Sequence, residues 1–177
     1  GVEIIRWAKA RGISVTAEVT PHHLLLTDES ALGYDPIFKV NPPLRTEQDV
    51  MALRAGLADG TIDIVGTDHA PHPTEDKDCE WQSAAFGMVG LETALSVVVK
   101  SMIETKLMSW SDLVDRMSIA PARIAGYSNH GRNIAVGAPA NLTIIDTSSN
   151  WIVDRNRLAS KSKNTPFQAM SLPARVL

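Results

Sequence analysis

An aspartate and two histidines follow an apolar run near the middle of the chain, in the order Asp68-His69-Ala70-Pro71-His72. The preceding residues 62–67 are rich in β-branched side chains, which is typical of a buried strand. In α/β folds the loops after the carboxyl ends of parallel strands carry the active site, so this position favours a metal site or an acid–base site. A simpler interpretation is that Asp68 caps a helix and that the histidines are ordinary loop residues.

A second stretch of the chain repeats the same pattern. Residues 14–20 contain another β-branched run, and Pro21 interrupts it just before His22 and His23. Two strands that both end in side chains able to bind a metal are harder to explain as ordinary loops than one such strand. We therefore expect the chemistry of this chain to lie where these two strands end.

The composition indicates a globular protein whose partner is a small molecule. Of the 177 residues, 44% are hydrophobic and 21% are charged, and the formal net charge is −3 without any block of Lys or Arg. This charge pattern excludes an electrostatic footprint for nucleic acid or for an anionic membrane. Cys79 is the only cysteine, so any metal must be held by His and carboxylate side chains. The chain shows neither a membrane span nor a signal peptide, which points to the cytoplasm.

The elements that must position these residues form an alternating pattern. We predict a helix over 2–10 that stops at Gly12, the strand over 14–20, and a second short strand at about 37–40 ahead of Asn41-Pro42-Pro43. A helix capped at Thr46 and ending near Gly60 leads to the strand that carries Asp68. Strands separated by such crossovers pair in parallel, which predicts the α/β fold class.

The second half of the chain is predicted to be helical and then β-rich. Residues 69–90 form a long charged segment, and such segments inside a compact domain are often active-site lids, although a solvated surface loop is the alternative. Helices are expected at about 91–104, 110–117 and 120–125. Beyond 131 we expect a turn followed by a strand over 134–146, another strand at 151–153 and no terminal element. This change of pattern along the chain predicts two units, an α/β part over 1–130 and part of a small β-rich domain over 131–177.

Six stretches, spread in order over nearly the whole chain, carry a resemblance to a known family. They are Glu18-Val19-Thr20-Pro21-His22-His23-Leu24, Lys39-Val40-Asn41-Pro42-Pro43-Leu44-Arg45, Gly66-Thr67-Asp68-His69-Ala70-Pro71-His72, Phe86-Gly87-Met88-Val89-Gly90-Leu91-Glu92-Thr93, Ala140-Asn141-Leu142-Thr143-Ile144-Ile145-Asp146 and Asn164-Thr165-Pro166-Phe167. The Pro-His-His run alone would be a weak signal, but several of these stretches in this order are specific. The sequence resembles the dihydroorotases of the amidohydrolase superfamily, in the bacterial group related to a domain of animal multifunctional pyrimidine enzymes.

The resemblance implies a fold and a metal centre. It places the three predicted strands as the last strands of a TIM-type (β/α)8 barrel, followed by part of a small β domain. Members of the family hold two zinc ions (Zn²⁺) at the barrel mouth. By this match Asp68 contacts the first zinc and acts as general base and then as general acid, and His23 is a ligand of the second zinc. The choice of His23 over His22 rests on the resemblance alone.

The resemblance also implies a reaction and its substrate contacts. The reaction is the reversible cyclisation of N-carbamoyl-L-aspartate to L-dihydroorotate in pyrimidine biosynthesis. Asn41 and His72 would hold the substrate, because an amide and a ring N–H can both donate to its carboxylate. Backbone groups around Phe86 and Gly87 would contact the pyrimidine ring.

Several residues that the family uses are absent from this chain. The family barrel begins with a His-x-His pair and uses a bridging acid or carboxylated lysine and a further histidine on its middle strands, whereas no His-x-His occurs here. We therefore expect a C-terminal part of such an enzyme, with about three of the eight barrel strands. Alone, this part should be inactive, and it should aggregate unless the missing half is supplied.

Two alternatives to this function remain open. One is another cyclic amidase of the superfamily, such as a hydantoinase, a dihydropyrimidinase or an allantoinase. The other is an inactive homologue that acts as a scaffold for aspartate transcarbamoylase. The partners left open besides the small-molecule substrate are a second copy of the chain, as a homodimer, and aspartate transcarbamoylase.

Overall fold

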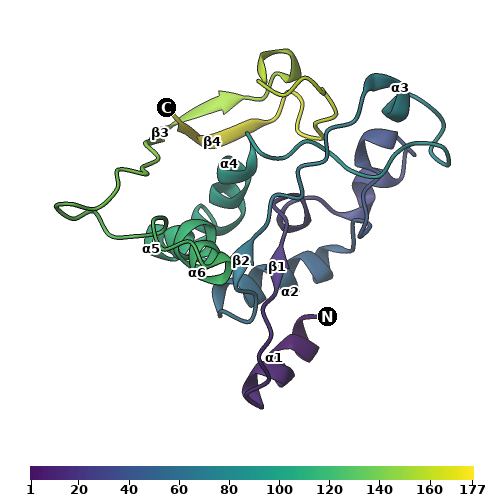
Figure 1. Cartoon of the computed structure of the whole chain (residues 1–177). Helices are drawn as coiled ribbons and strands as arrows, with labels where there is room; N and C mark the ends of the chain where they lie inside the picture. The colour runs from purple at the N-terminus through teal and green to yellow at the C-terminus, as the bar shows by residue number, and fades with distance from the viewer.

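A computed structural model describes residues 1–177, and two short parallel strands lie at its centre (Figure 1). Strand β1 (Glu18–Val19) pairs with β2 (Ile64–Val65) in parallel, with Glu18 opposite Ile64 and Val19 opposite Val65. The predicted parallel pairing is confirmed, but each strand is shorter than its β-branched run. Each of these strands has only the other as its partner, so the ladder of hydrogen bonds stays short.

The strand predicted at 37–40 is wrong. Residues Pro36–Phe38 form a short 3-10 helix, η3, instead. Asp35 caps this helix, because its carboxylate accepts a hydrogen bond from the Ile37 N–H at 2.9 Å, and Pro36 has the fixed φ that suits a first helical position. Within residues 37–40, the backbone contact to a distant segment is made by Lys39, whose carbonyl accepts from the Gly87 N–H at 2.9 Å.

The helices of the first half lie where the sequence predicts them. Helix α1 spans Val2–Ala10 and is followed by Gly12 with a φ of +71°. Helix α2 spans Glu47–Ala58, and the Thr46 hydroxyl caps it by accepting from the Asp49 N–H at 3.3 Å. Short 3-10 turns are found at η1 (His22–Leu24) and η2 (Asp28–Ala31), and α3 (Thr74–Lys77) is a single turn.

The helices of the second half contain wider turns. Helix α4 (Ala94–Val98) continues into a π-helical turn, η4 (Val99–Ile103). Helix α5 (Trp110–Val114), the π-helical turn η5 (Asp115–Ile119) and α6 (Ala120–Ala125) follow one another without a break. The two separate helices predicted over this range therefore form one, which begins after the cap residue Ser109 and ends at Gly126, with a φ of +74°.

The C-terminal region forms an antiparallel ribbon that differs from the prediction. Strand β3 (Ile145–Ile152) joins the two predicted strands into one, with an irregularity in register between Asp146 and Asn150, and η6 (Arg155–Arg157) follows it. Strand β4 (Ser171–Val176) pairs with β3, so the expectation of no terminal element is wrong. The sequence signal for β4 is weak because Pro173 interrupts it, and proline usually disqualifies a strand interior.

The ribbon shares its hydrophobic core with the preceding helices. β4 lies against α4, where the Ser96 hydroxyl donates to the Ala174 carbonyl at 2.7 Å. Phe167 and Leu172 are buried together with Met88 and Val97. A second buried cluster joins β1, β2, α2 and the helices over 94–113; it includes Val19, Leu57, Val65, Met102, Leu113 and Ala174. The division into units at residue 130 stays a prediction.

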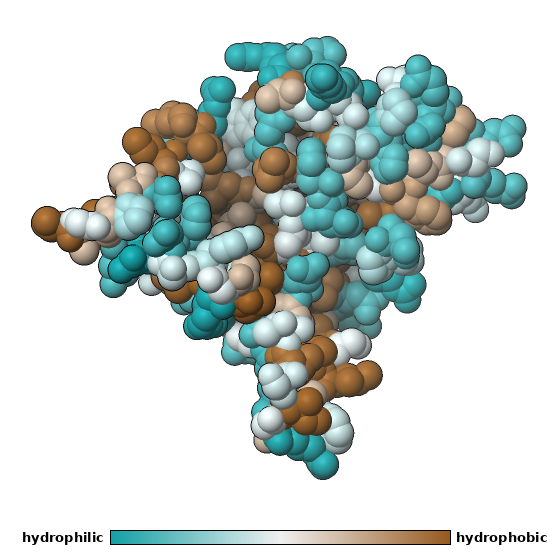
Figure 2. All heavy atoms as spheres, viewed as in Figure 1, coloured by the Kyte–Doolittle hydropathy of each residue, from teal (hydrophilic) through white to brown (hydrophobic).

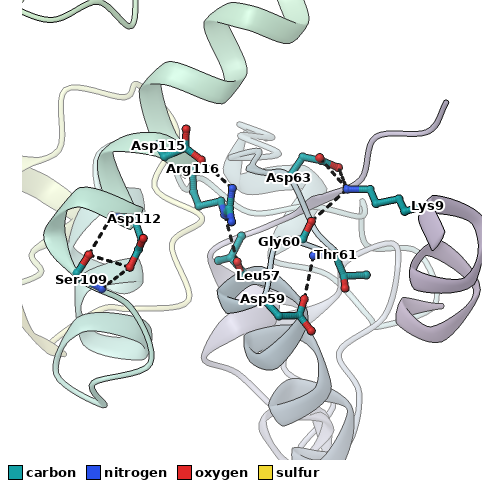
Figure 3. A network of polar contacts seen from close by, with 10 residues as sticks. All are labelled: Lys9, Leu57, Asp59, Gly60, Thr61, Asp63, Ser109, Asp112, Asp115 and Arg116. Atoms are coloured by element: carbon teal, nitrogen blue, oxygen red, sulfur yellow. Dashed lines mark hydrogen bonds and ion pairs between the residues drawn. The ribbon is translucent and has the colours of Figure 1, made fainter. Parts of the chain in front are cut away.

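Polar contacts tie α1 to the segment that enters β2, and the helices over 110–125 to the end of α2 (Figure 3). The Lys9 ammonium contacts both oxygens of the Asp63 carboxylate at 2.7 Å, and the Ala17 N–H donates to the same carboxylate at 2.8 Å. Partial burial alone would raise the pKa of Asp63, but these two partners hold it below the ordinary value of 3.8. On the other side, Arg116 donates to the Leu57 carbonyl at 3.1 Å. No helix of the chain is both long and apolar enough to span a membrane.

Candidate functional site

Asp68 lies directly beyond β2 and has an unusual backbone conformation. Its φ is +46°, in the left-handed region that aspartate tolerates better than most residues. Its carboxylate is exposed and makes no hydrogen bond or ion pair within the chain. Strained residues of this kind cluster at functional sites. Asp68 is therefore a free carboxylate at a strand tip, as its predicted role requires.

His23 is buried, and both of its ring nitrogens have partners within the chain. Nε2 lies 3.0 Å from the Pro42 carbonyl oxygen, which can only accept, so Nε2 carries the proton. Nδ1 then accepts from the Thr20 hydroxyl at 2.7 Å. A metal at Nε2 would take the place of the Pro42 contact, and Nδ1–H would then donate to the Thr20 hydroxyl. The metal role of His23 stays a prediction; in the structure His23 contacts the turn that follows Asn41.

His22 differs from its neighbour. Its ring is 1% exposed and lies 4.5 Å from the ring of His23, centroid to centroid. Burial, and secondarily the neighbouring His23, lowers the pKa of His22 to about 3, so the ring is neutral at physiological pH. Its Nε2 is buried without a hydrogen-bond partner. Of the two histidines, His22 is thus the one with unmet hydrogen-bonding capacity.

The structure brings His72, Phe86 and Gly87 together. The His72 Nε2–H donates to the Phe86 carbonyl at 2.8 Å. Gly87 has a φ of +125°, and a Cβ at this position would lie 2.5 Å from the Cβ of Ala70 and 3.2 Å from His72 Nε2. Only glycine fits here. The nitrogen of His72 that is left for a substrate is Nδ1, which carries a proton only when the ring is an imidazolium.

The remaining predicted site residues are linked to this group through backbone contacts. Ala70 N–H donates to the Met88 carbonyl at 3.0 Å, which places the segment after Asp68 beside the segment after Gly87. The Lys39 carbonyl accepts from the Gly87 N–H at 2.9 Å, two residues before Asn41. Asn41 is exposed, and its side chain has no partner within the chain. Asn41 and Asp68 thus carry unpaired polar groups on segments that are hydrogen-bonded to the segment around Gly87.

Three residues that the sequence analysis gave no role hold this arrangement in place: Lys39, Lys77 and Asn164. The Asn164 amide donates to the Ala70 carbonyl at 2.9 Å and accepts from the His72 N–H at 3.3 Å. Lys39 and Lys77 are 7% and 6% exposed, and each ammonium contacts three backbone carbonyls. A lysine between the apolar residues Phe38 and Val40 was the sequence signal that could have identified Lys39.

A cavity of about 570 Å³ opens beside this group. Its lining includes His72, Lys77 and Asn164, but not Asp68 or Asn41. The cavity therefore reaches one side of the predicted substrate site without reaching the predicted base.

The chain alone does not offer a complete metal site. No group of three or more His, Cys, Asp or Glu side chains is placed to hold a metal ion. Asp68 supplies one free carboxylate, while both nitrogens of His23 are occupied. Structural and catalytic zinc sites use at least three protein ligands, so further ligands would have to come from outside this chain.

Sequence comparisons match the chain to a protein family and to curated dihydroorotases. Residues 2–176 match the family described as "Amidohydrolase family". The chain is 64% identical over 175 residues to a dihydroorotase of Streptomyces coelicolor and 55% identical to a dihydroorotase of Mycobacterium tuberculosis. Each alignment covers 99% of this chain but 41% of the relative. The chain thus spans about two fifths of the length of these relatives.

Comparison with solved structures supports the fold. An L-hydantoinase (dihydropyrimidinase) from Arthrobacter aurescens matches with a TM-score of 0.91 at 34% identity, over 99% of this chain and 40% of that protein. A D-hydantoinase (dihydropyrimidinase) from Thermus sp. matches with a TM-score of 0.89 at 25% identity, over the same shares. These matches confirm the predicted fold class, part of a TIM-type barrel enzyme of mixed α/β structure. The chain belongs to the amidohydrolase family, and this membership implies a metal cofactor.

Proposed function

We propose that this chain is part of a dihydroorotase, which interconverts N-carbamoyl-L-aspartate and L-dihydroorotate. The observation that carries this proposal is the identity of 49–64% to dihydroorotases over nearly the whole chain. The named stretches of the site support it, because Asp68, Asn41, His72, Phe86 and Gly87 lie on segments that the structure joins by hydrogen bonds.

The role proposed for Asp68 is to move the proton of the reaction. Its exposed carboxylate has no partner in the chain, so it can take a proton from the attacking water and return it to the leaving nitrogen when the ring opens. In the direction of ring closure the same carboxylate takes the proton from the attacking nitrogen. Its fixed left-handed backbone holds the carboxylate at the strand tip.

Asn41, His72 and the Phe86–Gly87 backbone are proposed to bind the substrate. The Asn41 amide can donate to a substrate carboxylate, and His72 can donate through Nδ1 while its Nε2–H stays on the Phe86 carbonyl. Gly87 has no side chain, so its backbone can pack closely against Ala70 and His72 and stay beside the predicted substrate contacts. The substrate of this site would therefore be a ring that carries a carboxylate.

We propose zinc as the metal, with two ions in the complete site and with Asp68 and His23 as the ligands that this chain supplies. Zinc accepts carboxylate and imidazole ligands, and this chain has a single cysteine. The remaining ligands would come from the rest of a protein of the relatives' length, called the complete protein below. The complete protein is proposed to act in the cytoplasm, with a homodimer and an association with aspartate transcarbamoylase as its candidate assemblies.

A substrate panel tests this proposal against its nearest alternative. The complete protein, loaded with zinc, would be assayed with L-dihydroorotate, dihydrouracil, a hydantoin and allantoin. We expect dihydroorotate to have the highest kcat/KM, by about 100-fold or more. A substrate without a carboxylate would leave the polar groups that bind it without a partner, and sites of this kind discriminate strongly against such substrates. A preference for the hydantoin or for dihydrouracil would favour the cyclic amidases that the structural comparison matches. A folded complete protein without turnover of any of the four would support the inactive scaffold.

A further inference from the structure

Two buried ammonium groups lie beneath the loop that carries Phe86 and Gly87. The Lys39 Nζ donates to the carbonyls of Trp81, Gln82 and Ala84, at 2.8, 3.1 and 2.6 Å. The Lys77 Nζ donates to the carbonyls of Ala85, Gly87 and Lys39, at 2.9, 3.0 and 3.3 Å. Together they contact five of the seven backbone carbonyls of residues 81–87.

These lysines have no carboxylate partners. No ion pair of the chain involves Lys39 or Lys77. An ammonium group has three donors, and here all three of each group meet carbonyl oxygens. Burial and the neighbouring Lys39 ammonium lower the pKa of Lys77 to about 8, while Asp35 and Cys79 act in the opposite direction. Buried charges that are satisfied only by backbone carbonyls are unusual, and they indicate that the conformation of this loop is specified.

The contacts of the two lysines converge on the segment predicted to meet the substrate. The Lys39 Nζ also lies 4.4 Å from the centroid of the Phe86 ring, within the range of a cation–π contact. The Lys39 backbone carbonyl accepts from the Gly87 N–H, and the Phe86 carbonyl accepts from His72. The position of Phe86 and Gly87 relative to His72 therefore depends on both ammonium groups.

We propose that Lys39 and Lys77 are positioning residues, whose ammonium groups fix the carbonyls of residues 81–87 and so hold the Phe86–Gly87 backbone against the ring of the substrate. This inference rests on the proposed function, because it takes the Phe86–Gly87 backbone to contact a cyclic substrate. Residues 81–87 would then be a fixed part of the segment 69–90. The lid motion predicted for that segment stays a prediction.

The test compares lysine variants of the complete protein. Lys39→Met and Lys77→Met remove one ammonium each and keep much of the apolar stem. Lys161→Met, at an exposed lysine whose ammonium makes no hydrogen bond or ion pair, is the matched control. Two quantities would be measured: backbone hydrogen exchange of residues 80–89 by mass spectrometry, and kcat and KM for L-dihydroorotate. If a methionine variant fails to fold, Lys77→Gln keeps two N–H donors without the charge and takes its place.

We expect Lys39→Met and Lys77→Met each to speed hydrogen exchange over residues 80–89 by about tenfold or more. Local opening of the loop costs less free energy when it no longer has to break the ammonium contacts. We also expect KM to rise by about tenfold or more while kcat changes by less than about threefold, since uniform substrate binding is what a misplaced binding segment loses. Lys161→Met should leave the exchange rates, kcat and KM unchanged.

Two outcomes would overturn the inference. Exchange equal to that of the control would show that the lysines do not hold the loop. Faster exchange with an unchanged KM would show a local stabilising role without a role in substrate binding. If the complete protein turned over no dihydroorotate, the proposed function would fail. The role of the two lysines would then be tested in the same way with KM for whichever cyclic amide the protein accepts. If it accepts none, the dissociation constant for dihydroorotate would take the place of KM.

Discussion

At the scale of single residues, Gly87 is the position where the backbone restricts the sequence most. Its φ of +125° is strained for any other residue, and a Cβ would meet Ala70 at 2.5 Å and His72 at 3.2 Å. We expect Gly87→Ala to lower the stability of the complete protein by about 1–3 kcal/mol and to weaken substrate binding. Urea unfolding and KM for dihydroorotate would measure both effects.

Gly33→Ala is the control for this change, because Gly33 has nothing within 4 Å of the Cβ position and no positive φ. It should behave like the unmodified protein. A Gly87→Ala variant with unchanged stability and KM would contradict the close approach of Ala70 and His72 to Gly87.

His23 offers a second test at this scale, because its metal role rests on the resemblance alone. Glutamine can keep a donor toward the Pro42 carbonyl but removes the imidazole, so His23→Gln should lower the metal content of the complete protein by about one ion per chain. Metal per chain would be measured by inductively coupled plasma mass spectrometry. A metal content equal to that of the unmodified protein would contradict the metal role of His23 and leave it the role of holding the turn that follows Asn41.

The sequence identified some site residues and missed others for a clear reason. Asp68 and His72 stand out because chemistry-bearing side chains follow an apolar strand directly. Lys39 and Lys77 do not, because their function depends on carbonyls up to 45 residues away, and no local pattern reports which carbonyls will surround an ammonium group. The contact between His23 and the Pro42 carbonyl could likewise not be predicted, because a turn whose course the sequence does not specify brings Pro42 to His23.

At the scale of elements, the Lys9–Asp63 pair joins α1 to the segment that enters β2. The side chains of these residues are 25% and 19% exposed, so solvent screens the pair only in part. We expect Asp63→Asn to destabilise the complete protein by about 1.5–3 kcal/mol at pH 7, the range for hydrogen bonds to charged groups. The exposed Glu29, which has no hydrogen bond from its side chain, provides the control variant Glu29→Gln.

The same pair predicts an acid dependence. The pKa of Asp63 is lower in the folded chain than its ordinary value of 3.8. The unfolded chain therefore binds the proton first as the pH falls below about 4, so the stabilisation is present at higher pH and is lost through the folded pKa. The stability gap between the unmodified protein and Asp63→Asn should shrink over this range in urea unfolding curves. A gap that stays constant down to pH 2.5 would contradict the assignment.

Elements with a strong local signal were predicted well, and the others were not. Helices α1 and α2 have clear periodicity and end signals, and their bounds agree with the structure to within two residues. The strand predicted at 37–40 failed because Asp35 and Pro36 start a 3-10 turn that competes with pairing. β4 was missed because its pairing with β3 and its burial against α4, both non-local, outweigh the cost of Pro173 within the strand.

At the scale of the whole molecule, the chain exposes apolar side chains on two surfaces. On α1, Ile4 and Trp7 are 68% and 52% exposed, and the brown atoms of this helix are visible at the bottom of Figure 2. In the segment 131–144, Ile134 and Val136 are 84% and fully exposed. β1 also has an edge without a partner strand. Surfaces and edges of this kind favour association.

The 177-residue chain should therefore self-associate when it is purified alone. Size-exclusion chromatography with light scattering should give a mass above the monomer's 19.2 kDa. Adding the remaining segment of a dihydroorotase relative should reduce the self-association, if that segment covers these surfaces. A monomer with a single cooperative melting transition and no partner chain would contradict this prediction.

The central claim is that Asp68 is the proton-transferring carboxylate of a dihydroorotase. The measurement that tests it most directly is the turnover of L-dihydroorotate by the complete protein and by its Asp68→Asn variant, with circular dichroism to compare their folding. The account predicts measurable turnover by the unmodified protein and a loss of at least about 100-fold in kcat for the folded variant, the range over which general acid–base groups contribute. Unchanged turnover in a folded Asp68→Asn variant would contradict the account.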